Sequence, residues 1–254
     1  MKKIRVNGIE LAFERYGSGM PLVLLHGFPL DHSIWMDVVP LLQNDFDLIL
    51  PDLRGFGEST AVDTQYSMND FAADLFGLLN LLGLEKAAFA GHSMGGYVAL
   101  AFAKLYPARI SGLALVSSQA AADTPERKEG RYKTAEDVKV KGVGTVADAM
   151  TNKLSTDPHV REFIRPLILR QSASAVTGAL RAMAEREDMM LSASTFSVPL
   201  FLLHGIADEL IPIERAREIK ALKNDAKLVE LAGVGHMPMM ESAAQVADAL
   251  KMLR

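Results

Sequence analysis

The residue of this chain best suited to chemistry is Ser93, which lies between two glycines in the segment Gly91-His92-Ser93-Met94-Gly95. This spacing matches the G-x-S-x-G nucleophile elbow, in which a serine stands on a sharp turn between a strand and a helix. A side chain at either glycine would collide with neighbouring backbone, and the serine is expected to adopt a strained conformation. A glycine-rich turn that only needs flexibility would have the same residues. The motif therefore indicates a nucleophile only if the sequence also supplies catalytic partners.

A serine hydroxyl needs a base to remove its proton, and the base needs a carboxylate to hold its tautomer. On an elbow of this kind the acid and then the histidine follow the serine along the chain. The six histidines are His26, His32, His92, His159, His204 and His236. Only His236 follows both Ser93 and an acid at a predicted strand end, which is Asp208. The sequence therefore predicts Ser93, Asp208 and His236 as a catalytic triad.

Each partner also has a plain structural interpretation. Asp208 could cap the helix that opens near Pro212, and His236 could be an ordinary loop histidine. The triad is favoured because all three residues follow predicted strands in the required order, which separate structural roles would not explain.

A tetrahedral intermediate needs at least two hydrogen-bond donors for its oxyanion. In a strand-turn-helix site one donor is the backbone N–H after the nucleophile, and the other comes from the loop after an early strand. These positions are Met94 and, in the segment "LLHGFPL", Phe28. Both backbone N–H groups are predicted to form the oxyanion hole.

These residues require a scaffold of alternating strands and helices. Short apolar runs such as "MPLVLLHG", "DLILPD" and "KAAFAGH" are typical of strands buried on both faces of a parallel sheet. Asn7-Gly8 predicts a tight antiparallel hairpin at the start of the chain. Between Ser67 and Gly83 the leucines recur at helical spacing behind a capping box, which predicts a crossover helix.

The alternation stops between residues 119 and 197, where only helical patterns occur, among them "TAEDVKVKGV", "TVADAMTNKL", "HVREFIRPLIL" and "AVTGALRAMAERED". Strand signals return in "VPLFLLHG" and "AKLVELAG". We therefore predict an α/β core at 1–118 and 198–254, with a helical cap inserted at 119–197.

Composition narrows the functional class. The net charge of -4 and the mixed placement of basic and acidic residues argue against a nucleic-acid partner. The chain has no cysteine, and no apolar run approaches the roughly 18 residues that cross a bilayer. We expect a cytoplasmic protein without a membrane partner and without a cofactor. Its oligomeric state cannot be derived from the sequence.

The segments "HGFPLDHSIW", "PDLRGFGEST", "GHSMGG", "GIADELIP" and "GVGHMPMMES" closely resemble those of the α/β-hydrolase family, in order and spacing. The resemblance covers almost the whole chain. It implies a mostly parallel eight-stranded sheet flanked by helices, and it implies Ser93, Asp208 and His236 as the triad. The cap resembles that of the family's small esterases, enol-lactonases and cofactor-free perhydrolases. A serine rather than an aspartate at the elbow indicates the ester-type branch.

Other residues of these segments are assigned less specific roles. In the family, "DLRGFGES" shapes a loop, so Asp52 and Arg54 are expected to be structural, and His26 is expected to anchor a loop. The candidate pocket residues are Trp35, Met150, Met183, Met189 and Met190, although methionines at helical spacing also fill cores. No polar anchor for a charged substrate is evident, which favours small uncharged esters.

The sequence thus predicts a serine hydrolase that cleaves small carboxylic esters through an acyl-enzyme. A lactonase of the enol-lactonase type, or a perhydrolase, would use the same triad on another substrate. A ligand receptor with little turnover is the alternative from a different class. The expected partner in every case is a small molecule.

Overall fold

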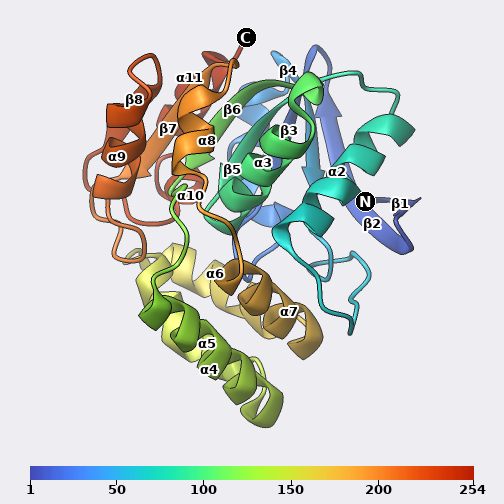
Figure 1. Cartoon of the computed structure of the whole chain (residues 1–254), viewed down its shortest axis with the longest axis vertical. Helices are drawn as coiled ribbons and strands as arrows, with labels where there is room; N and C mark the ends of the chain where they lie inside the picture. Colours follow the sequence, from blue (N-terminus) through green and yellow to red (C-terminus); the bar gives the residue numbers. More distant parts are fainter.

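A computed structural model describes residues 1–254, and its centre is one eight-stranded sheet (Figure 1). The strands are β1 (Lys2–Val6), β2 (Ile9–Gly17), β3 (Met20–Leu25), β4 (Phe46–Pro51), β5 (Ala87–His92), β6 (Ile110–Val116), β7 (Leu200–Gly205) and β8 (Lys227–Leu231). Their spatial order is β1-β2-β4-β3-β5-β6-β7-β8. β2 is antiparallel to β1 and to β4, whereas all the other neighbours are parallel. The predicted mostly parallel eight-stranded sheet is confirmed.

Local sequence explains these strands. Asn7 and Gly8 both have positive φ, as a tight hairpin between β1 and β2 requires. Every residue of β4, β5 and β7 is buried, which accounts for their continuous apolar sequence.

Helices flank the sheet. They are α1 (Val39–Leu42), α2 (Met68–Leu81), α3 (Met94–Leu105), α9 (Glu214–Leu222), α10 (Pro238–Glu241) and α11 (Ala243–Lys251), with short 3₁₀ turns at His32–Trp35 and Pro107–Arg109. α2 is the predicted crossover helix, and Ser67 and Asp70 form its capping box. α9 begins at Glu214, two residues after Pro212, because Ile213 still belongs to the preceding turn. Figure 1 shows α2 and α3 in front of the sheet.

The chain between β6 and β7 is helical and contains no strand. Its helices are α4 (Pro125–Lys141), α5 (Gly144–Leu154), α6 (Pro158–Leu169), α7 (Ala173–Ala184) and α8 (Met190–Thr195). In Figure 1, α4 to α7 form a group beyond one end of the sheet, whereas α8 has returned to the core beside α9. All five helices fall within the cap predicted at 119–197, and α4 to α7 are the ones that lie beyond the sheet end.

The parallel strands place several loops at one edge of the sheet. Phe28 follows β3, Ser93 follows β5, Asp208 follows β7 and His236 follows β8. Parallel strands end at the same edge, so residues far apart in the sequence become neighbours there. None of the helices is both long and apolar enough to span a bilayer.

Candidate active site

Ser93 occupies the junction between β5 and α3, and its backbone is strained. Its φ of 50° and ψ of -114° lie in a region that residues with a side chain rarely adopt. Three hydrogen bonds hold this conformation. The Ser93 N–H donates to the Val116 carbonyl at 2.9 Å, and the Ser93 carbonyl accepts from Ser118 Oγ at 2.8 Å and from the Gly96 N–H at 2.9 Å.

The glycines of the turn are required by close packing. A Cβ atom on Gly91 would lie 2.3 Å from the Gly95 carbonyl oxygen, and one on Gly95 would lie 2.6 Å from that of Leu25. A Cβ on Gly96 would lie 2.2 Å from Ser118 Oγ. These distances are too short for any side chain, as the crowding argument from the sequence predicts.

Asp208 and His236 are hydrogen-bonded to each other. His236 Nδ1 lies 2.7 Å from Asp208 Oδ2, and both side chains are buried. The other carboxylate oxygen accepts from the backbone N–H groups of Leu210 and Ile211, each at 2.9 Å. Asp208 thus holds the turn that precedes α9, whereas the N-cap of that helix is Ile213, which has no side-chain cap bond.

The Asp208 carboxyl is ionised in this setting. Burial opposes its charge, but the nearby His236 ring, His204 and the backbone N–H groups outweigh burial and hold the pKa of Asp208 well below its ordinary value. His204 Nε2 donates to the Ile211 carbonyl at 2.7 Å and lies 3.4 Å from Asp208 Oδ2. An ionised Asp208 fixes the proton of His236 on Nδ1 and leaves Nε2 free to accept one.

Ser93 and His236 line the same cavity, which has a volume of about 370 Å³ beneath the cap helices. No hydrogen bond joins the Ser93 hydroxyl to the His236 ring in this structure. Hydrogen bonds between catalytic groups are often long before substrate binds. What relates Ser93 to His236 in this structure is that both line one cavity.

Of the two predicted oxyanion donors, one residue lines this cavity and the other directly follows Ser93. Phe28 lines the cavity, and Met94, fully buried, is the first residue of α3. A first-turn N–H has no acceptor within its own helix, so the Met94 N–H is available to a ligand.

Two further buried histidines form hydrogen bonds with the backbone around the site. His92 is fully buried, and its Nε2 donates to the backbone carbonyl of His236 at 2.8 Å. His26 anchors a loop, as expected, because its Nδ1 donates to the Gly27 carbonyl and its Nε2 accepts from the Leu53 N–H. Burial lowers the pKa of both rings, and the neighbouring His236 adds to this effect at His92. No sequence pattern indicates this role of His92, because its hydrogen bond crosses to a distant loop.

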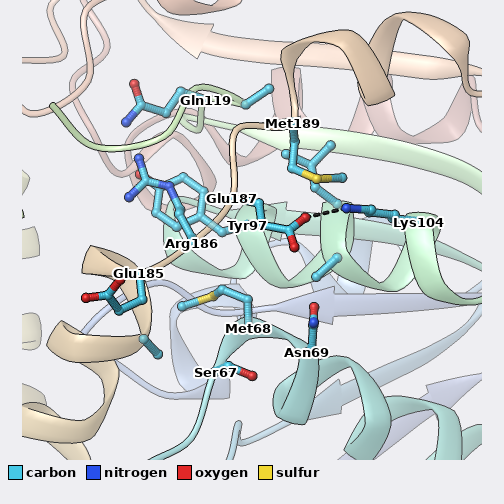
Figure 2. Close-up of a pocket in the computed structure, with 14 residues that line it drawn as sticks. Ser67, Met68, Asn69, Tyr97, Lys104, Gln119, Glu185, Arg186, Glu187 and Met189 are labelled. Atoms are coloured by element: carbon cyan, nitrogen blue, oxygen red, sulfur yellow. Dashed lines mark hydrogen bonds and ion pairs between the residues drawn. The ribbon is translucent and has the colours of Figure 1, made fainter.

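Two of the five candidate pocket residues line this cavity. Met150 and Met183 line the cavity with Ser93, whereas Trp35, Met189 and Met190 do not. Trp35 is fully buried in a 3₁₀ turn that packs on β3, β4 and α10. Met189 lies on the wall of a second, smaller cavity (Figure 2), and Met190 begins α8, which has left the cap. The correction arises because the chain turns back to the core after α7.

The second cavity, of about 100 Å³, adjoins the first at Tyr97, which lines both. Figure 2 shows the Tyr97 ring beside the Arg186 guanidinium, whose carbon lies 4.2 Å from the ring centroid. On the same wall Lys104 forms an ion pair with Glu187.

Three cationic side chains also line the cavity of Ser93 and His236, and the sequence analysis did not predict them. They are Arg127 and Arg131 on α4 and Lys153 on α5. The predicted helix began at Thr134, but α4 begins at Pro125, with Thr124 as its N-cap. A capping threonine followed by a proline is a helix-start signal, and this pair in the sequence indicates the earlier start of α4.

One cluster outside the cavity has the composition of a metal site. Ligand atoms of Asp31, His32 and Asp52 lie within 4.8 Å of one another. Protein donors already occupy these atoms. Asp31 accepts from Ser33 and Arg170, and Asp52 accepts from the N–H and Nδ1 of His32. The cluster therefore stabilises the loop, as expected for Asp52.

A family model described as the alpha/beta hydrolase fold matches residues 20–243. The AB hydrolase superfamily protein YisY of Bacillus subtilis is 30% identical over 251 residues, which are 94% of this chain and 92% of that protein.

Solved structures are similar over nearly the whole chain. A thermophilic esterase from Thermogutta terrifontis with malate bound is 38% identical, with a TM-score of 0.95 over 99% of this chain and 97% of the esterase. The enol-lactonase from Burkholderia xenovorans LB400 is 26% identical, with a TM-score of 0.91 over 99% of both chains.

Proposed function

Since this chain belongs to the α/β-hydrolase fold family, we propose that it is a serine hydrolase that cleaves small carboxylic esters through an acyl-enzyme. The observation that carries the proposal is the Asp208–His236 hydrogen bond at the wall of the cavity that Ser93 also lines. The similarity to an esterase at 38% identity supports the same reaction class.

In the proposed mechanism Ser93 Oγ attacks the ester carbonyl carbon while His236 Nε2 accepts the hydroxyl proton. Ionised Asp208 stabilises the imidazolium through Nδ1. The carbonyl oxygen becomes an oxyanion that accepts hydrogen bonds from the N–H groups of Phe28 and Met94.

His236 then donates its proton to the departing alcohol, which leaves an ester between the acyl group and Ser93. A water molecule attacks this ester with His236 again as the base, so the carboxylic acid leaves and Ser93 recovers its proton. Every group in this scheme belongs to the chain itself or to the substrate.

A lactonase is the second candidate, and the similarity to an enol-lactonase at 26% identity favours it. A lactone is a cyclic ester, so the same steps open its ring. A perhydrolase would replace water by peroxide at the second step. These alternatives differ in substrate and share the proposed triad.

Labelling by a fluorophosphonate tests the proposal, because the oxygen of an activated serine displaces fluoride from the reagent and becomes phosphonylated. We expect covalent modification of Ser93, hydrolysis of p-nitrophenyl acetate, and loss of both in Ser93→Ala. A panel of esters and lactones of varied acyl length then separates the two candidates. Tight ligand binding without labelling or turnover would contradict the proposal and favour a receptor.

A further inference from the structure

The catalytic cavity is covered by two cap helices that each present one face to it. From α4 the lining residues are Arg127, Gly130, Arg131 and Thr134, and from α5 they are Val146, Ala149, Met150 and Lys153. Both sets follow the spacing i, i+3, i+4, i+7, which places four residues on one side of a helix. Arg127, Arg131 and Lys153 are thus held over the cavity, and we call them the cationic roof.

The charge of this roof is positive, whereas the net charge of the whole chain is negative. No aspartate or glutamate is among the residues that line the cavity, although the chain has a net charge of -4. Helix α4 itself carries several acids, but its acids lie on other faces. The positive charge is therefore a local property of the cavity.

Only one carboxylate compensates this charge, and it is shared. Asp123, whose side chain is fully buried, pairs with Arg131, with Arg186 at 2.8 Å and more loosely with Arg127 at 3.5 Å. Three guanidinium groups thus share one negative charge, and Lys153 forms no ion pair. The roof retains an excess of positive charge.

The neighbouring cavity shows the contrast. Its cation Lys104 pairs with Glu187, and a second acid, Glu185, also lines it (Figure 2). The second cavity is therefore lined by acidic as well as basic side chains. The catalytic cavity is lined by basic side chains without acidic ones, so a negatively charged group of a ligand can pair with them.

We propose that the substrate is an ester or lactone that carries a separate carboxylate group, which the cationic roof binds while Ser93 attacks the ester carbonyl. Guanidinium groups suit this role because their paired N–H donors match the two oxygens of a carboxylate. This inference rests on the proposed function. It replaces the expectation of uncharged esters, which was based on a sequence in which no polar anchor was evident.

A roof that only stabilised the reaction's oxyanion would act equally on charged and neutral esters. The test is therefore a ratio between matched substrates. One pair is 4-acetoxybenzoate and its methyl ester, with the carboxylate on the leaving group. The other is monophenyl glutarate and its methyl ester, with the carboxylate on the acyl group.

We expect one carboxylate substrate to exceed its methyl ester in kcat/KM by roughly tenfold at low salt, chiefly through a lower KM, as two partly exposed ion pairs would give. The ratio should fall towards one in Arg127→Gln and in Lys153→Gln. Lys133→Gln is the matched control, because it removes a charge from an exposed position of α4 outside the cavity, and it should keep the wild-type ratio. Added salt should lower the ratio in the wild type, since these cations are partly exposed.

Two outcomes would overturn the inference while the proposed function stands. One is efficient hydrolysis of both methyl esters with a ratio of one or less. The other is a high ratio that neither glutamine variant changes. Failure of all four esters together with an unlabelled Ser93 would instead overturn the proposed function, and this inference with it.

Discussion

The rings of His92 and His236 lie 4.9 Å apart between centroids, and His92 Nε2 donates a hydrogen bond to the His236 backbone carbonyl. His92 immediately precedes Ser93 in the sequence, whereas His236 lies in the loop after β8. One buried side chain therefore ties the turn that carries Ser93 to the loop that carries the proposed base.

Loss of this tie should impair catalysis more than binding. In His92→Ala the His236 loop loses a buried hydrogen bond, so we expect kcat to fall roughly fivefold to tenfold with little change in KM, as one net hydrogen bond would give. His92→Gln retains an N–H donor and should recover most of the activity. Steady-state kinetics with p-nitrophenyl acetate measure both variants, and an alanine variant with wild-type kcat would refute the positioning role.

The buried histidines should make stability depend on pH. Burial lowers the pKa of His26 and His92, so below about pH 6.5 the unfolded chain binds protons that the folded protein does not. The free energy of unfolding should therefore decrease as the pH falls below that value. His32 acts oppositely, because its hydrogen bond to Asp52 outweighs burial and raises its pKa.

His92→Gln removes one of the two histidine titrations that lower the free energy of unfolding in acid. Between about pH 6.5 and 5.5 its unfolding free energy should fall less than that of the wild type, by at most about 1.4 kcal/mol for one proton per pH unit. Chemical denaturation at the two pH values measures this difference. His159→Gln, which replaces an exposed ring, is the control and should keep the wild-type slope.

The strained backbone at Ser93 should lower the free energy of unfolding. A residue with a Cβ at φ 50° and ψ -114° costs about 1–3 kcal/mol, a cost that glycine avoids. Ser93→Gly should therefore raise the free energy of unfolding relative to Ser93→Ala by about 1 kcal/mol, after glycine's larger unfolded-state entropy is subtracted. Thermal or urea unfolding compares them, and an alanine variant as stable as the glycine variant would count against strain at this position.

Tyr97 should limit how far a substrate reaches beyond the catalytic cavity. It borders both cavities and is almost completely buried beneath Arg186. Tyr97→Ala should join the two spaces and raise kcat/KM for hexanoate relative to acetate esters by roughly tenfold or more, since each accommodated methylene is worth about 1 kcal/mol.

Tyr97→Phe keeps the ring and should preserve the wild-type preference. The alanine variant should also lose about 3 kcal/mol of stability, so circular dichroism must first show that it is folded at the assay temperature. An unchanged chain-length profile in a folded Tyr97→Ala would contradict the predicted role of Tyr97.

Much of the fold was readable because its signals are local. The apolar run of β5, the capping box at Ser67 and the Asn7-Gly8 turn each depend on residues that are adjacent or one helical turn apart. The cationic roof could not be predicted from the sequence, because no local signal marks it. The face of α4 that lines the cavity is Arg127, Gly130, Arg131 and Thr134, so it lacks the apolar periodicity by which a helix is usually found.

The sequence by itself determined the order of strands and helices and the few polar residues that follow strand ends, because backbone preference and hydrophobic period act over short stretches. Only the tertiary structure decided which side chains share the space around Ser93. It joined His236 to Asp208 and to His92, sent Trp35 into the core and Met189 to another cavity, and turned Arg127, Arg131 and Lys153 inward. Such directions depend on how each helix is rotated and packed against distant elements, and no local pattern specifies that rotation.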